Sequence, residues 1–310
     1  MDQHIAELSD QAYAAWSRGE LRLASQHFAS LLDHDPRHES WHYMRGLVHK
    51  YLRDWPTSLR HNLTALELSD KPDNATCWNA GIAATALGDW TEARRLWALC
   101  AIQLPGTEGP IDGDFGVVSI RLNPWGKGET LFARRIDIVR SRLLNVPLPE
   151  SGYRFGDIVL HDGAKTGSRH DGNTEIPVFN ALERLIPSEF QTFTVFVECD
   201  SQTDLNSLLD ATGPGIGFSE DWTSGITYYC LRCSYNLPHR HNPEDTDDEW
   251  QADRTLGIAA QSRRSVEKLL QDWASCGSGR HIVAIESRES AVPASEDGHV
   301  WWVGPDDGDR

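Results

Sequence analysis

The side chains with the most obvious potential for chemistry lie in residues 230–241, which read CLRCSYNLPHRH. Cys230 and Cys233 are followed there by His239 and His241. Two thiolates and two imidazoles are the number and type of ligands that a closed tetrahedral zinc site takes. The cysteines, however, fall in a stretch that reads as a strand, where residues three apart point to opposite faces, and His-x-His is shorter than the usual finger spacing. We therefore predict no cofactor and keep zinc as the alternative.

Two His-Asp-Gly triplets, at 161–163 and 170–172, form a second candidate site. A His and an Asp side by side can bind a metal or act as an acid–base couple, which leaves a hydrolytic enzyme open as an alternative. Asp-Gly after a strand is also typical of a turn, and we expect turns here. The chain has no Gly-Lys-Ser/Thr phosphate loop, no Gly-x-Ser-x-Gly elbow and no His-Glu-x-x-His. We therefore predict that the protein is not an enzyme.

The elements around these residues set their positions. From residue 189 onward the chain alternates between apolar strands and amphipathic helices. Ser201 and Ser262 stand where they would cap the two helices. The order βαββαβ is that of the ferredoxin-like split βαβ, to which we assign residues 189–290. The strands are predicted at 193–198, 225–234, 255–260 and 281–286, and the helices at 203–211 and 262–273.

The middle of the chain is predicted to be a small β-rich region over residues 115–188. A Gly- and Pro-rich stretch at 104–116 marks its start. Short apolar runs separated by turn residues indicate a mostly antiparallel sheet. Residues 291–310 form an acidic tail, in which HVWWV at 299–303 predicts an extra edge strand or a docked segment. The runs are at 117–122, 130–137, 155–160 and 175–179.

Residues 5–104 repeat three times, with spacings of 34 and then 35 residues. One column holds the small residues Ala12, Gly46 and Gly81, which allow paired helices to approach closely. A turn column holds Gly19, Arg53 and Gly88, and a third column holds Phe28, Asn62 and Trp97. The third copy, CWNAGIAATALGDWTEARRLW, is the most specific. The region resembles the tetratricopeptide repeat (TPR) family, which implies three helix hairpins over residues 1–104.

The resemblance implies a protein-binding groove lined by the first helix of each repeat. Aromatic side chains are suitable anchors there because they bury much area for little lost rotamer entropy. Core packing stays open as an alternative for Trp16 and Trp78. The Lys and Asn pattern with which some relatives bind a peptide C-terminus is missing, which argues against chaperone-tail binding. The groove positions are Tyr13, Trp16, Tyr43, Lys50, Tyr51 and Trp78.

The charge balance favours a basic protein as the partner, or simply serves solubility. The 310 residues include 46 acidic and 29 basic side chains, a formal net charge of −17. Nucleic acid is a poor partner for such a chain, because affinity for a duplex comes mainly from Lys and Arg at the phosphates. An acidic block could instead speed association with a basic partner, although such blocks are more often solvated loops. The block comprises Glu244, Asp245, Asp247, Asp248 and Glu249.

The same composition predicts a cytoplasmic protein that does not bind membranes. No run approaches the ~18 apolar residues of a membrane span, and the first residues lack the basic and apolar regions of a signal peptide. The six cysteines are scattered, as expected for thiols in a reducing compartment.

Taken together, these features predict an α+β multidomain chain: an N-terminal all-α TPR-like helical array, a small mostly antiparallel β region and a ferredoxin-like domain. The arrangement, especially residues 122–163, resembles TPR-containing immunity proteins of bacterial polymorphic (Rhs-type) toxins. That resemblance implies a partner-binding protein that occludes a cognate toxin domain. The alternatives are the zinc-binding or hydrolytic enzyme described above, and a TPR scaffold adaptor unrelated to toxins.

Overall fold

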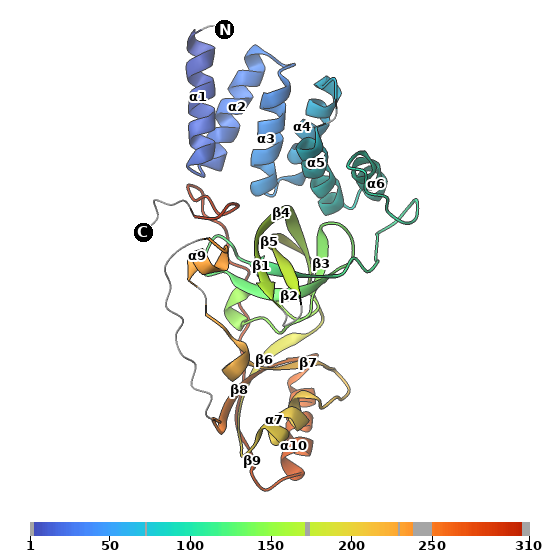
Figure 1. Ribbon diagram of the computed structural model, residues 1–310, viewed down its shortest axis with the longest axis vertical. Coiled ribbons are helices and arrows are strands. Elements are labelled where there is room, and N and C mark those ends of the chain that lie inside the picture. Colours follow the sequence, from blue (N-terminus) through green and yellow to red (C-terminus); the bar gives the residue numbers. More distant parts are fainter. Residues whose placement is uncertain (1–2, 72, 171–173, 229, 238–249, 306–310) are drawn as a thin grey trace.

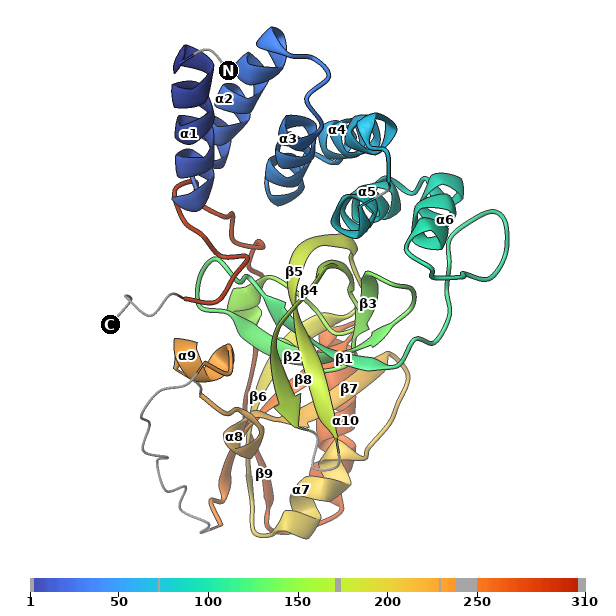
Figure 2. The ribbon, with the colours of Figure 1, turned by 45° about the horizontal axis from the view of Figure 1, so that its top comes forward.

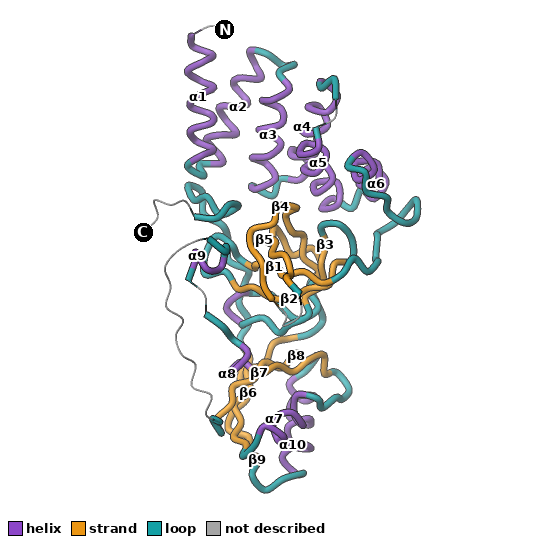
Figure 3. The backbone as a smooth tube through the Cα atoms, in the orientation of Figure 1, coloured by secondary structure: helices purple, strands orange, loops and turns teal. Residues whose placement is uncertain are grey.

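The computed structural model describes residues 3–71, 73–170, 174–228, 230–237 and 250–305. It is an α+β structure whose three parts follow one another along the long axis (Figure 1). A helical array lies at one end, a closed β barrel in the middle, and a four-stranded sheet with two helices at the other end (Figure 3). Within the described ranges, no helix has the length and apolar character needed to cross a membrane.

The array consists of three helix hairpins, and the small-residue column predicted from the repeats lies where their helices cross. A Cβ added to Gly46 would lie 2.6 Å from Asn62, and one added to Gly81 would lie 2.9 Å from Trp97. These are contacts between paired columns of the repeat, so the predicted packing is confirmed in two hairpins. The helices are α1 (Gln3–Ser17), α2 (Leu21–His34), α3 (Glu39–Tyr51), α4 (Trp55–Leu68), α5 (Asn74–Leu87) and α6 (Trp90–Leu99).

The turn column has one backbone conformation in all three hairpins. Gly19, Arg53 and Gly88 have φ values of 75°, 60° and 70°. This left-handed region is open to glycine and costly for other residues, which explains the two glycines. Arg53 adopts the same left-handed conformation although it has a Cβ, so the second hairpin differs from the others in residue type and carries backbone strain at this turn.

The middle region is a five-stranded closed barrel with the strand order β1-β2-β3-β4-β5. Consecutive strands pair antiparallel, and a parallel pairing of β1 with β5 closes the barrel. β4 and β5 form a long hairpin that reaches the helical array (Figure 2). The strands are β1 (Val117–Leu122), β2 (Glu129–Arg135), β3 (Arg140–Leu143), β4 (Ile158–His170) and β5 (Glu175–Ile186), with the short helix η1 (Pro149–Ser151) before β4.

The C-terminal unit has the predicted element order and a sheet in the order β7-β8-β6-β9, with every neighbouring pair antiparallel. Leu205 and Leu208 of α7 and Val266 and Leu270 of α10 pack on the sheet. Ser201 and Ser262 cap these helices as expected. The elements are β6 (Gln191–Cys199), α7 (Gln202–Leu209), β7 (Ile216–Asp221), β8 (Asp253–Ala260), α10 (Arg263–Ser275) and β9 (Arg280–Ser287).

The predicted strand at 225–234 is wrong, because the second strand of the sheet is β7. Asp221 accepts a hydrogen bond from the Thr223 backbone N–H and caps the short helix α8 (Trp222–Gly225), which ends the strand. Ile226, Thr227 and Tyr228 are in no strand, and Tyr228 is 90% exposed. A second short helix, α9 (Leu231–Ser234), follows.

Two half-buried carboxylates hold the loop after β3 at the junction of the barrel and the C-terminal sheet. Glu129 of β2 accepts from the Leu148 backbone N–H at 3.0 Å. Glu220 of β7 accepts from Asn145 Nδ2 at 2.7 Å and from the Val146 N–H at 2.9 Å. Burial raises the pKa of Glu129 to about 7, and the negative charge of the nearby Glu220 adds to the rise. The hydrogen bond from the Leu148 N–H lowers this pKa, but by less than burial raises it. Burial also raises the pKa of Glu220.

This junction predicts a pH-dependent stability. Because the folded-state pKa of Glu129 is raised, the folded protein retains a proton that the unfolded chain loses above pH ~4.3, and stability falls as the pH rises toward 7. Glu129→Gln keeps an acceptor for Leu148 without the charge. We expect it to stabilise the protein at pH 8 by on the order of 1 kcal/mol and to change little at pH 5, measured by urea denaturation. The exposed Glu67→Gln is the control; equal effects of both substitutions would contradict the assignment.

Candidate protein-binding site on the inner face of the array

The face of the array that is turned toward the barrel and the C-terminal segment, here called the inner face, carries four of the residues predicted to line a groove: Trp16, Lys50, Tyr51 and Trp78. Its hydrophobic core is continuous with the barrel and the C-terminus: one cluster includes Val48 of α3, Trp125, Leu160 of β4 and Trp301. The array is therefore covered on this side by the rest of the chain (Figure 2).

The aromatic residues predicted to line the groove differ in exposure. Tyr13 is 38% exposed and packs edge-on against Phe28 at 5.3 Å. Trp16 and Tyr43 are half-buried. Trp78 is also half-buried, where it packs against Trp97 at a ring distance of 5.0 Å. Tyr13 is the predicted groove residue that the described structure leaves most open to a partner.

Lys50 and Tyr51 are instead buried in an ionic cluster with Asp162 of β4. The Lys50 ammonium donates to both Asp162 carboxylate oxygens, at 3.0 and 3.1 Å, and to Asn79 Oδ1 at 3.1 Å. The Tyr51 hydroxyl donates to Asp162 at 2.9 Å. Burial alone would raise the pKa of Asp162, but Lys50 and the hydrogen bonds hold it below its usual value. Burial, together with Asp162, raises the pKa of Tyr51 well above its usual value.

This cluster corrects the sequence-based role of Lys50 and of the Tyr51 hydroxyl, whose polar contacts lie within the chain. Lys50 and Tyr51 were expected to contact a partner, but they are 3% and 6% exposed and make their polar contacts within the chain. The burial follows from the neighbouring Gly163, where an added Cβ would lie 2.6 Å from the Trp78 ring. Glycine lets β4 come this close to the array and delivers the Asp162 carboxylate to Lys50.

The first His-Asp-Gly triplet is also not the turn that the sequence predicted. Residues 161–163 lie inside β4, at a shift of register against β5. The His161 Nδ1 lies 2.8 Å from the backbone oxygen of Asp162, and burial lowers the pKa of His161 to about 4. The Asp162 carboxylate is engaged by Lys50 and Tyr51, so the two side chains do not form an acid–base couple. Of the second triplet, residues 171–172 lie outside the described residues.

The C-terminal segment docks on the inner face through two tryptophans. Trp302 stacks on Trp16 and on Tyr51, at 4.7 Å in both cases. Trp301 packs edge-on against Tyr51 at 5.3 Å and against Trp125 at 5.2 Å. The segment is docked, as one of the two sequence-based alternatives proposed, and residues 299–303 form no strand.

Hydrogen bonds hold the same segment to the turns of the array. The Leu21 backbone N–H donates to Asp297 Oδ1 at 2.7 Å, and the Gly298 N–H donates to the Gly19 carbonyl at 2.8 Å. An added Cβ at Gly19 would lie 2.5 Å from the backbone of His299, so glycine is needed there for the approach as well as for its left-handed φ. The segment thus lies across the end of α1 between the array and the barrel (Figure 1).

The predicted zinc ligands fall only in part within the described residues. Cys230 and Cys233 lie at and in α9, where the Cys233 N–H donates to the Cys230 sulfur at 3.4 Å. His239 and His241 lie outside the described residues, as does the acidic block Glu244, Asp245, Asp247, Asp248 and Glu249. Among the residues that are described, no three His, Cys, Asp or Glu side chains group in a way that could hold a metal ion.

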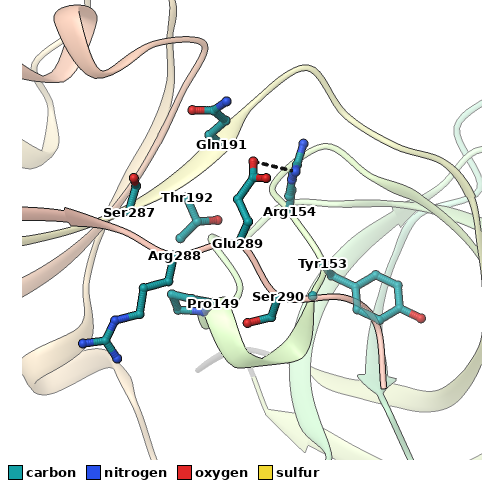
Figure 4. A pocket seen from close by; sticks show the side chains of 10 residues that line it. Pro149, Tyr153, Arg154, Gln191, Thr192, Ser287, Arg288, Glu289 and Ser290 are labelled. Carbon is teal, nitrogen blue, oxygen red and sulfur yellow. Dashed lines mark hydrogen bonds and ion pairs between the residues drawn. The ribbon is translucent and has the colours of Figure 1, made fainter. Parts of the chain in front are cut away.

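A polar cavity of about 310 Å³ lies between the barrel and the C-terminal sheet (Figure 4). Arg154 and Glu289 form an ion pair across it, at 3.1 Å. Thr192 also lines it, and its hydroxyl is buried without a hydrogen-bond partner. None of its ten lining residues is a Cys or His, so the cavity offers no activated thiol and no imidazole base.

Comparisons with known proteins give structural similarities only. No family model and no curated protein matches the chain. Among solved structures, the TPR2B domain of yeast Sti1 in its pHsp70 complex aligns over 31% of this chain and 76% of its own, at 11% identity and a TM-score of 0.29. A hypothetical protein from Neisseria gonorrhoeae aligns over 61% of this chain and 100% of its own, at 11% identity and a TM-score of 0.22.

Proposed function

We propose that this chain is a protein-binding protein, and more specifically a cytoplasmic immunity protein that binds and occludes a basic toxin domain. The observation that carries the proposal is the inner face of the array, which holds an extended polypeptide, the chain's own C-terminal segment, by ring stacking and backbone hydrogen bonds. A surface that holds one polypeptide in this way has the chemistry to hold another.

The assignments to TPR-like repeats and to a ferredoxin-like C-terminal domain belong to the same proposal. The crossing contacts at Gly46 and Gly81 and the repeated left-handed turn support the first. The strand order β7-β8-β6-β9 with antiparallel neighbours supports the second. Neither fold names a partner, since folds of both kinds carry many functions.

The basic character of the partner rests on charge. A net charge of −17 attracts a cationic domain over long range and repels nucleic acid. The occluding mechanism needs no chemistry from the chain: fast, salt-sensitive association brings the partner in, and a few buried aromatic anchors hold it.

The test is binding to the polypeptide encoded by the neighbouring reading frame, measured by interferometry at 50 and 300 mM salt, together with rescue of growth on co-expression. We expect tight binding, an association rate that falls at least about tenfold at the higher salt, and rescue. Asp247→Lys with Asp248→Lys should slow association more than Glu267→Lys with Asp272→Lys on α10, which changes the net charge equally. Absence of binding, or turnover of a substrate abolished by one side-chain replacement, would overturn the proposal.

A further inference from the structure

The first hairpin of the array lacks the helix cap that the other two hairpins provide for themselves. Asp54 and Asp89 follow the turn column and accept from backbone N–H groups of the helices that they precede, α4 and α6. At the matching position Glu20 makes no capping hydrogen bond and pairs with Arg18 at 2.6 Å. The Leu21 N–H at the start of α2 donates to the Gly19 carbonyl at 2.9 Å, and without a capping side chain from its own hairpin this helix start can take a carboxylate from elsewhere.

Asp297 of the C-terminal segment occupies this site. Its Oδ1 accepts from the Leu21 N–H at 2.7 Å, across 276 residues of sequence. Four and five residues later, Trp301 and Trp302 enter the aromatic pocket formed by Trp16, Tyr51 and Trp125. A carboxylate and two adjacent rings thus fill two separate subsites of one surface.

The segment is held as a bound peptide is held. Residues 288–303 contain no helix or strand. Their contacts are side-chain stacking, the Arg154–Glu289 ion pair and single hydrogen bonds, one of which runs from Asn180 Nδ2 of β5 to the Trp301 carbonyl. Arg53 donates to Ser295 Oγ at 2.6 Å and Trp125 Nε1 to the Pro293 carbonyl at 3.1 Å. Five residues without helix or strand, 288–292, separate the end of β9 at Ser287 from the first of these two contacts, at Pro293. The segment can therefore leave the surface without unpairing a strand.

We infer that residues 293–302 are the internal occupant of a peptide-binding site, and that the partner fitting this site is an extended segment with a carboxylate followed, four and five residues later, by two adjacent aromatic residues. The inference rests on the proposed function as a protein-binding protein. The required segment contains only one carboxylate, so a partner with a net positive charge can still contain it. Such a segment displaces the tail and is recognised by the uncapped start of α2 and by the ring pocket.

The probe is a fluorescein-labelled synthetic peptide with the sequence of residues 293–304, titrated into the full chain and followed by anisotropy. The tethered tail competes at an effective concentration of about millimolar, so wild type is expected to bind the peptide weakly. Trp302→Ala in the full chain removes a stacked anchor of the tail and leaves the pocket intact. It is expected to bind the peptide at least about tenfold more tightly than wild type.

The adjacent Val303→Ala is the matched control, because Val303 is 54% exposed and should leave peptide affinity at the wild-type value. A peptide with both tryptophans replaced by Ala, and one with Asn in place of the Asp, are expected to bind at least about tenfold more weakly to the Trp302→Ala chain. If Trp302→Ala fails to fold by circular dichroism, Asp297→Asn in the full chain, which keeps both rings, takes its place with the same expected direction.

Hydrogen exchange distinguishes a displaceable occupant from a fixed part of the core. We expect amides of residues 294–302 to exchange through local opening, faster than those of β1 and β6, and to accelerate further when excess unlabelled peptide is added. Three results would each overturn the inference. The segment exchanges only with global unfolding, neither variant binds the peptide more tightly than wild type, or the tail is exchanged between two copies in a dimer that does not bind the peptide. Binding of the neighbour-encoded polypeptide would be unaffected by that result, so the two proposals fail separately.

Discussion

Asp162→Asn is expected to lower the free energy of unfolding by about 3–5 kcal/mol, because it leaves the buried Lys50 ammonium without its counter-charge. Lys50 and Asp162 are 112 residues apart in sequence, and their side chains are 4% and 6% exposed. An uncompensated charge in such a place costs far more than the net gain from forming the pair. Urea denaturation followed by tryptophan fluorescence is the measurement.

The control for Asp162→Asn is Asp272→Asn, which breaks the Lys268–Asp272 pair on α10. That pair has a similar distance, 2.7 Å, but its side chains are 70% and 68% exposed. An exposed pair contributes about 0–1 kcal/mol, so a loss of less than 1 kcal/mol is expected there. Equal losses at the two positions would show that Asp162 does not neutralise a buried charge.

The Lys50–Asp162 pair also predicts an acid limb in the stability curve. The folded-state pKa of Asp162 is lowered, so its contribution is present above the unfolded pKa of ~3.9 and is lost as the pH falls through the folded value. The difference between wild type and Asp162→Asn should therefore shrink below pH ~4. The pKa shift of Glu129 has the opposite sign, so its contribution to stability is lost as the pH rises toward neutral. The two contributions can therefore be distinguished by the pH at which each variant departs from wild type.

Trp301→Ala is expected to lower the free energy of unfolding by about 3–5 kcal/mol, the range for truncating a large buried aromatic side chain. Trp301 is 2% exposed and joins three parts of the molecule: its ring contacts Tyr51 of the array and Trp125 before the barrel strand β2, and its carbonyl accepts from Asn180 Nδ2 of β5 at 3.1 Å. Removing the ring leaves a cavity at the meeting point. Near-ultraviolet circular dichroism should lose intensity in the same variant.

Val303→Ala removes apolar atoms from the same segment at a position that is 54% exposed, and it is expected to cost no more than about 0.5 kcal/mol. If Trp301→Ala costs as little as Val303→Ala, the segment contributes nothing to the junction of array and barrel. The Trp302→Ala peptide experiment would then lose its structural basis as well.

The local features of this chain could be predicted from its sequence because they depend on neighbours in the sequence. The helix hairpins follow from a 34- to 35-residue period whose small residues pack against the next helix, as Gly81 does against Trp97. The caps at Ser201 and Ser262 follow from the residue type at a helix start. The strand at Ile216–Asp221 was missed because its residues have weaker strand propensity than the more apolar and aromatic stretch that follows it.

Only the tertiary structure decided what the inner face of the array contacts. The sequence singled out Lys50 as a groove residue and Asp162 as part of a turn, but nothing in their types or spacing relates two positions so far apart. The same holds for Asp297 at the start of α2 and for Trp302 on Trp16. A contact between two distant positions leaves no repeating pattern along the chain by which it could be predicted. It arises where glycines such as Gly19 and Gly163 let backbones approach, and where burial makes an unpaired charge too costly to leave.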